Sequence, residues 1–113
     1  EAHEKLSFSV GGCAAAMSVL AASDRPAVLV LGIEAHVCVQ QTVLDLLHAG
    51  YEVHVALDAI GSRYGRDRQP AIQRMARAGA TGTTVEAALF ELLREAGTDR
   101  FRAVSRLIKT ADG

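Results

Sequence analysis

The sequence predicts a three-layer α/β/α, Rossmann-like fold built on a parallel sheet. Short apolar runs typical of buried strands alternate with segments in which apolar residues recur at helical spacing, and the connecting loops are short. Parallel strands joined by right-handed helical crossovers account for this order. Residues 1–12 have the character of a loop end rather than a domain start. We therefore expect the complete fold to contain one or more strands that precede Glu1.

Three segments predict the strands of this sheet. Residues 27–31 form a continuous apolar run, which is typical of a strand buried on both faces. Residues 51–57 repeat the signal, and residues 80–83 predict a short third strand. Ligands of such sheets gather at the carboxyl ends of the strands, where the loops converge. The loops at that edge cover residues 32–38, 58–63 and 81–84.

Helices are predicted between and beyond the strands. An Ala-rich segment at residues 13–22 precedes the first strand, and Met17 and Leu20 are expected to face inward. Thr83 and Glu86 have the spacing of a capping box for a helix over residues 85–93. The other predicted helices run from about Val39 to Gly50, through Ile72, Met75 and Ala76 to near Gly79, and from about Asp99 to Lys109.

Composition limits the function classes that are open to the chain. The 113 residues, with a formal net charge of -1, describe one globular domain covering residues 1–113. Because 12 basic residues face 13 acidic ones, we expect neither a nucleic acid nor a membrane as partner. The longest apolar stretch is too short to span a bilayer. We predict a cytoplasmic protein whose two cysteines are thiols.

Cys38 is the strongest candidate for chemistry, because it falls on the first turn of the helix after the first predicted strand. The partial positive charge at a helix N-terminus favours the thiolate, which is the nucleophilic form. Backbone N–H groups of the same turn are suited to hold an oxyanion. The alternative is that Cys38 is a small buried residue that packs the helix onto the sheet. Cys13 lies in the Ala-rich segment and is predicted to be structural.

The segment Gly32-Ile-Glu-Ala-His-Val-Cys-Val39 is followed by the amphipathic helix, Gly50-Tyr51, a strand, Asp58-Ala59 and Thr83-Thr-Val-Glu86. From about Glu4 to Lys109 the chain thus resembles the C-terminal half of the isochorismatase-like (cysteine hydrolase) superfamily. The closest resemblance is to isochorismatase domain-containing hydrolases whose substrate is mostly unassigned. It implies a homo-oligomeric C–N amidohydrolase that needs no cofactor. Its substrate would be a small amide or related carbonyl compound, cleaved through a thioester.

Two other functions stay open beside this one. The first is a catalytically inactive family member that serves as an assembly or binding module. The second is a small flavodoxin-like nucleotide binder, against which the absence of a Gly-rich phosphate loop speaks. An inactive family member would have little reason to keep both Lys5 and Cys38 within segments that resemble the family motifs.

The resemblance implies a catalytic triad of Cys, Asp and Lys. The Cys matches Cys38, and the Lys of a Glu-Lys-x-x-Phe-Ser segment matches Lys5. In such enzymes the Asp takes the thiol proton, while the Lys keeps the Asp charged and oriented. The Asp belongs to the first strand of the family fold, which would precede Glu1. Asp58 is a conceivable substitute, although a cap for its own loop is the simpler interpretation.

The resemblance also implies a cis peptide between Ile33 and Glu34, which directs the N–H groups of Glu34 and Cys38 toward an oxyanion site. Phe8, Ile33 and His36 are predicted to line the substrate pocket. We interpret His36 as a wall or capping residue rather than a base. Its position two residues before Cys38 turns its side chain to a different side.

The remaining charged residues near these loops have two interpretations each. Glu34 either contacts a substrate amine or pairs with an arginine at the pocket rim. Arg63, Arg66 and Arg68 either bind a carboxylate or lie in a solvated loop. His3, His48 and His54 have no ligand spacing to a Cys, Asp or Glu, so we predict no metal.

Overall fold

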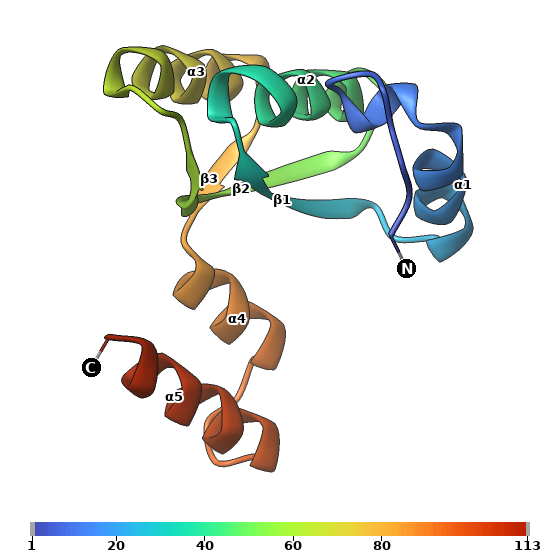
Figure 1. Cartoon of the computed structure of the whole chain (residues 1–113). Helices are drawn as coiled ribbons and strands as arrows, with labels where there is room; N and C mark the ends of the chain where they lie inside the picture. The colour runs from blue at the N-terminus through green and yellow to red at the C-terminus, as the bar shows by residue number, and fades with distance from the viewer. Residues whose placement is uncertain (1, 113) are drawn as a thin grey trace.

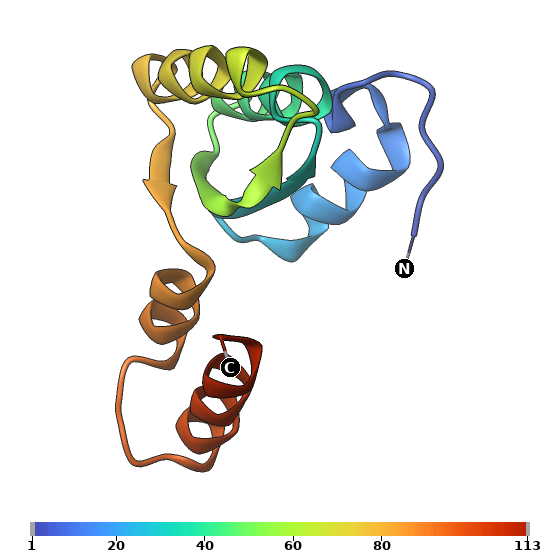
Figure 2. The same ribbon diagram turned by 60° about the vertical axis from the view of Figure 1, so that its left-hand side comes forward.

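The computed structural model describes residues 2–112 as a parallel sheet with helices on both sides (Figure 1). The sheet has the strand order β1-β2-β3, with β1 at Ala27–Ile33, β2 at Glu52–Gly61 and β3 at Thr81–Thr83. The helices are α1 (Ala14–Ser23), α2 (Gln40–His48), α3 (Gly65–Ala78), α4 (Val85–Leu93) and α5 (Asp99–Asp112). Helices α2 and α3 lie together over one face, and α4 and α5 extend from the other side (Figure 2). The predicted α/β fold with parallel strands is confirmed.

The core lies between the sheet and helices α2 and α3. Val43 and Leu46 of α2 are buried completely or nearly so, as are Val53 and Val55 of β2. The spacing of each pair places it on one face of its element, because side chains repeat every 3.6 residues in a helix and every two in a strand. The full cluster comprises Ala35, Val39, Val43, Leu46, Val53, Val55, Ile60, Ala71 and Met75. Met17 and Leu20 of α1 pack against this cluster, as predicted.

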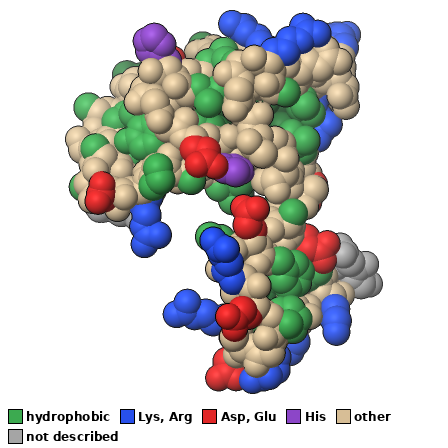
Figure 3. Space-filling view, turned by 180° about the vertical axis from the view of Figure 1, so that it is seen from behind, with side chains coloured by type: hydrophobic (Ala, Val, Ile, Leu, Met, Phe, Trp, Pro, Cys, Tyr) green, Lys and Arg blue, Asp and Glu red, His purple; other side chains and the backbone are tan. Residues whose placement is uncertain are grey.

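β1 is covered on one face only within the described part of the chain. Val28 and Val30 pack against the core, whereas Leu29, Leu31 and Ile33 are 42%, 56% and 75% exposed. The prediction of a strand buried on both faces is therefore wrong for residues 2–112, because the outer side chains of β1 stay largely exposed. Seen from behind, the molecule is hollowed between the sheet and the two C-terminal helices (Figure 3). This groove is lined by Ala27, Val28, Leu29, His54, Thr83, Ala88, Glu91 and Leu92.

β2 continues to Gly61, beyond the predicted end at Leu57. Val30 pairs with Val55, but Gly32 pairs with Ile60, so β2 accommodates additional residues between these two pairs. An irregularity of this kind bends a strand while pairing resumes beyond it. As a result Asp58, expected at the start of a loop, lies inside β2.

Local signals fix most helix ends. Gly79 follows α3 with φ of 114° and Gly50 follows α2 with φ of 95°, a conformation that favours glycine. The predicted capping box of Thr83 and Glu86 is wrong, because Thr83 belongs to β3, where it pairs with Ala56 of β2. Thr84 is the N-cap of α4 instead, and its Oγ1 accepts a 3.2 Å hydrogen bond from the Ala87 N–H.

None of the helices in the described part of the chain combines the length and apolar character that crossing a bilayer requires.

Candidate active site

Cys38 lies on a π-helical turn, Ala35–Val39, that leads from the end of β1 into α2. The Ile33–Glu34 peptide bond is cis, as the family resemblance implied. The Glu34 carbonyl accepts hydrogen bonds of 3.1 Å from the N–H groups of both Val37 and Val39. Among the hydrogen bonds of residues 2–112, the N–H of Cys38 makes none to this carbonyl. In this widened turn, the Glu34 carbonyl thus bonds the amides on either side of Cys38 and not the amide of Cys38 itself. Turns of this π-helical kind are frequent at functional sites.

A pocket of about 170 Å³ lies at this end of the sheet, and both Lys5 and Cys38 contribute to its wall. Cys38 is partly exposed. The Lys5 Nζ donates hydrogen bonds to the carbonyl oxygens of Ser7 (2.9 Å) and Phe8 (2.7 Å). An ammonium group has three donors, so one N–H of Lys5 has no acceptor among the hydrogen bonds of the described residues. The rest of the lining is mainly aliphatic: Val10, Val30, Leu31, Gly32, Ile33, Val39 and Thr42.

The segment that carries Lys5 is anchored to α2 by polar contacts that the sequence analysis missed. The Thr42 hydroxyl accepts the Val10 N–H at 2.9 Å, and the Ser9 hydroxyl donates to the Asp45 carboxylate at 2.6 Å. Thr42 and Asp45 lie three residues apart, on one side of α2. Two polar residues at that spacing on the amphipathic helix α2 were the available signal, although they do not indicate the partner segment.

Cys13 is buried, with 7% of its surface exposed, which agrees with the predicted structural role. Its Sγ lies 3.5 Å from the Glu4 carbonyl oxygen, with which it forms a sulfur hydrogen bond. This contact holds the residue next to Lys5 against the start of α1.

Ile33 belongs to the lining of the pocket beside Cys38, but Phe8 and His36 do not. The Phe8 side chain is 58% exposed, and the contact of this residue with Lys5 is made through its carbonyl. The His36 side chain reaches the opposite loop, where Nδ1 lies 2.8 Å from the Ser62 hydroxyl and Nε2 lies 3.8 Å from the Asp67 carboxylate. Neither residue therefore lines this pocket within residues 2–112, and their role in binding a substrate stays a prediction.

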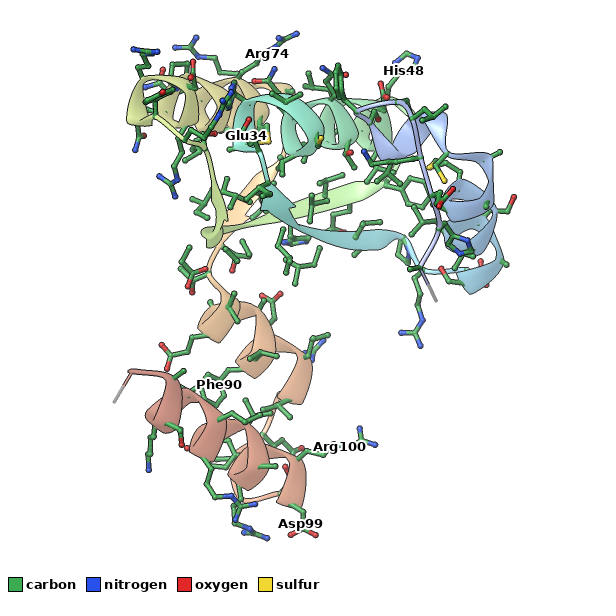
Figure 4. The ribbon with its side chains drawn as sticks, viewed as in Figure 1. Glu34, His48, Arg74, Phe90, Asp99 and Arg100 are labelled. Atoms are coloured by element: carbon green, nitrogen blue, oxygen red, sulfur yellow. The ribbon has the colours of Figure 1, made fainter. Side chains whose placement is uncertain are left out.

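Glu34 pairs with Arg63 rather than lining the pocket. Its Oε1 accepts hydrogen bonds from the backbone N–H of Arg63 at 3.2 Å and from the Nε–H at 3.1 Å. The backbone hydrogen bond and the positive charge of Arg63 hold the pKa of this carboxyl below its ordinary value of 4.5, although desolvation opposes the shift. Figure 4 shows Glu34 where β1 enters the turn, beside the chain that rises toward α3.

Arg63, in the loop after β2, and Arg66 and Arg68, in the first turn of α3, have separate partners. Arg66 lies over the Tyr64 ring, 4.5 Å from its centroid, while Arg63 holds Glu34. Arg68 donates to the carbonyl oxygens of Ile60, at 3.4 Å, and Leu57. The three side chains therefore do not converge on one carboxylate-binding position.

Two further predictions concern acidic residues and metals. The Asp58 carboxylate accepts a hydrogen bond from the Val85 N–H and is absent from the pocket beside Cys38. This agrees with a capping role, exerted on α4 rather than on its own loop. Within residues 2–112, no three His, Cys, Asp or Glu side chains are grouped so that they could hold a metal ion.

Residues 15–87 match the family model described as "Isochorismatase domain". The chain is 49% identical over 86 residues to "Secreted isochorismatase effector Isc1" of Phytophthora sojae, an alignment that covers 76% of this chain and 41% of that protein. It is 38% identical over 106 residues to "Isochorismatase domain-containing protein 2" of Xenopus laevis, covering 94% of this chain and 52% of that protein. The chain therefore belongs to the isochorismatase family.

The fold is likewise shared with a solved structure described as "MAR1 Ribonuclease from Caenorhabditis elegans". The TM-score is 0.83 at 41% identity, and the match covers 92% of this chain and 53% of that one. The chain spans about half the length of the relatives that it matches. Pyrazinamidase of Pyrococcus horikoshii, solved in complex with zinc, matches with a TM-score of 0.66 at 25% identity.

Proposed function

We propose that the protein is a cysteine hydrolase that cleaves a small amide or related carbonyl compound, with Cys38 as its nucleophile. The observation that carries this proposal is the shared pocket of Cys38 and Lys5 at the carboxyl end of β1. An ammonium group and a helix start both favour the negative charge of a thiolate. The small volume and aliphatic lining of the pocket favour a small substrate with an apolar substituent.

The proposed reaction proceeds through a thioester. The Cys38 sulfur adds to the carbonyl carbon, and the thiol proton passes to a base. The C–N bond then breaks, and the departing nitrogen takes the electron pair and a proton. Water next adds to the thioester, the C–S bond breaks, and the acid and the free thiol are released. The N–H groups of Glu34 and Cys38 are the proposed donors to the oxyanion, and the Cys38 N–H is not engaged by the Glu34 carbonyl.

The base in this proposal is an Asp, as in the family triad. Asp45 is hydrogen bonded to Ser9, and Asp58 binds the start of α4. Neither lines the pocket beside Cys38. Among residues 2–112 the Lys5 Nζ makes two hydrogen bonds, so its third N–H would be available to a carboxylate that enters this pocket.

The test replaces Cys38 by Ala in the natural gene product and measures turnover of a panel of small amides. We expect turnover to fall by roughly 1000-fold or more, whereas Cys13→Ala should retain it. An RNA oligonucleotide belongs in the panel, because the C. elegans neighbour is described as a ribonuclease. Turnover that persists in Cys38→Ala would exclude the mechanism. A parent protein that turns over no substrate, and whose Cys38 is unreactive, would support the non-catalytic alternative.

We also propose that the chain assembles into homo-oligomers. YcaC from Escherichia coli is described as an octameric hydrolase of unknown specificity, but at 21% identity its TM-score of 0.75 shows a shared fold alone. The support from this chain is the exposed aliphatic face of β1. Sedimentation at several concentrations tests the proposal, and a monomer throughout would contradict it. The cytoplasmic location stays a prediction, since the Phytophthora relative is described as secreted.

A further inference from the structure

Arg63 and Glu34 are joined by two hydrogen bonds across 29 residues of sequence. One donor is the Arg63 backbone N–H and the other is its Nε–H, and both reach the same carboxylate oxygen of Glu34. The Glu34 side chain is 25% exposed, whereas that of Arg63 is 75% exposed. A largely solvated arginine thus holds the less exposed carboxylate in one position.

The strand register explains why these two residues meet. Ile33 pairs with Gly61 at the carboxyl ends of β1 and β2. The turn carrying Cys38 and the loop leading to α3 therefore leave the sheet side by side. A second contact joins the same two segments, since His36 Nδ1 lies 2.8 Å from the Ser62 hydroxyl. The turn is therefore held to this loop by two of its side chains, those of Glu34 and His36.

Glu34 connects this contact to the nucleophile through its backbone. Its carbonyl accepts the N–H groups of Val37 and Val39, which flank Cys38. The orientation of that carbonyl determines where the turn places the sulfur and the amide of Cys38. A side chain that fixes Glu34 therefore fixes the geometry of the turn.

We propose that Arg63 is a positioning residue, which acts through Glu34 to hold the Cys38 turn against the pocket that it shares with Lys5. The inference rests on the proposed function, because it assigns a role within the same site. Arg63 is absent from the pocket lining and touches none of the proposed reacting atoms. Its effect is therefore on the placement of Cys38 and not on the chemistry directly.

The test compares the alkylation of Cys38 by iodoacetate, an anion, with that by neutral iodoacetamide in the intact chain. The ammonium group of Lys5 in the same pocket should favour the anion, so the ratio of the two rates reports how Cys38 sits relative to Lys5. We expect Arg63→Ala to lower this ratio by roughly threefold to tenfold, the size appropriate to an exposed charge-assisted contact. Arg63→Lys should restore part of it. Arg66→Ala is the matched control, because Arg66 lies over Tyr64 instead.

The double variant Glu34→Ala/Arg63→Ala shows whether Arg63 acts through Glu34. We expect the ratio of the double variant to equal that of Glu34→Ala alone, because the two residues form one contact. An Arg63→Ala ratio equal to that of the parent chain would overturn the inference, as would an additive effect in the double variant. In either case a fast reaction at Cys38 would leave the proposed function standing. A parent chain whose Cys38 reacts no faster than Cys13 would reject both.

Discussion

The Asp58 carboxylate accepts a hydrogen bond of 2.9 Å from the backbone N–H of Val85, the first residue of α4. This bond joins the irregular part of β2 to the helix that follows β3. A carboxylate at a helix N-terminus satisfies a free N–H group and lies favourably in the dipole of the helix. Asp58 thereby serves the attachment of α4 and is not in the pocket of Cys38.

Replacing Asp58 by Ala should destabilise the fold by about 1 kcal/mol, because the N–H of Val85 loses its acceptor. Thr84→Ala should have an effect of similar size, since the Thr84 hydroxyl caps the same helix by accepting the Ala87 N–H. The measurement is the free energy of unfolding in urea. Asp58→Asn keeps an acceptor oxygen and should lose less stability than Asp58→Ala. Equal stability of Asp58→Ala and the parent chain would contradict the capping role.

Iodoacetamide should label Cys38 at least about 10-fold faster than Cys13 at neutral pH, because a thiol that reagents can reach reacts first. Cys38 is partly exposed, whereas Cys13 is 7% exposed and directed at the Glu4 carbonyl. Mass spectrometry of the two cysteine peptides over time gives both rates. Comparable rates would remove the evidence for a reactive thiol at position 38.

Glu34 should make the stability of the chain depend on pH in the acidic range. The pKa of Glu34 is held below its ordinary value of 4.5 in the folded chain, so its ionised form stabilises the fold above that pH. The contribution is lost as the pH falls through the folded pKa. We expect Glu34→Gln to be less stable than the parent at pH 7 and to approach it as the pH falls below 4.5. The measurement is the urea midpoint of both chains across this pH range. A stability difference that does not change with pH would contradict the lowered pKa of Glu34.

Leu46→Ala should cost about 2 to 5 kcal/mol of stability, because it opens a cavity in the core between α2 and the sheet. Leu46 is 1% exposed and belongs to the central cluster. Leu92→Ala is the matched control, since Leu92 is 78% exposed and its truncation should stay within about 0.5 kcal/mol. Unfolding in urea measures both variants. Similar losses for the two leucines would show that the core is not where the structure places it.

The order of strands and helices could be predicted from local patterns, because the core imposes them. Val39, Val43 and Leu46 recur at helical spacing, and Val53 and Val55 alternate along β2, since each set faces the same cluster. The end of β2 could not be predicted in this way. Its extension to Gly61 depends on the register with β1, which is a property of the partner strand.

The polar contacts of the site lay beyond local patterns for a related reason. Ser9 with Asp45, and His36 with Ser62, are pairs from distant segments, and no spacing within either segment indicates its partner. The cis peptide before Glu34 was implied by family resemblance instead. Phe8 is near Lys5 in sequence, but the hydrogen bond between them uses the Phe8 carbonyl, which sequence patterns do not indicate.

Among the described strands, β2 alone has a hydrogen-bonded neighbour along both edges. In deuterated water its amide protons should therefore be the last to exchange, and those along the open edge of β1 should exchange earlier. The strand that precedes Cys38 is thus not the part of the sheet that we expect to open most slowly. Local opening of β1 would therefore displace Cys38 while the hydrogen bonds of β2 at the centre of the sheet are still formed.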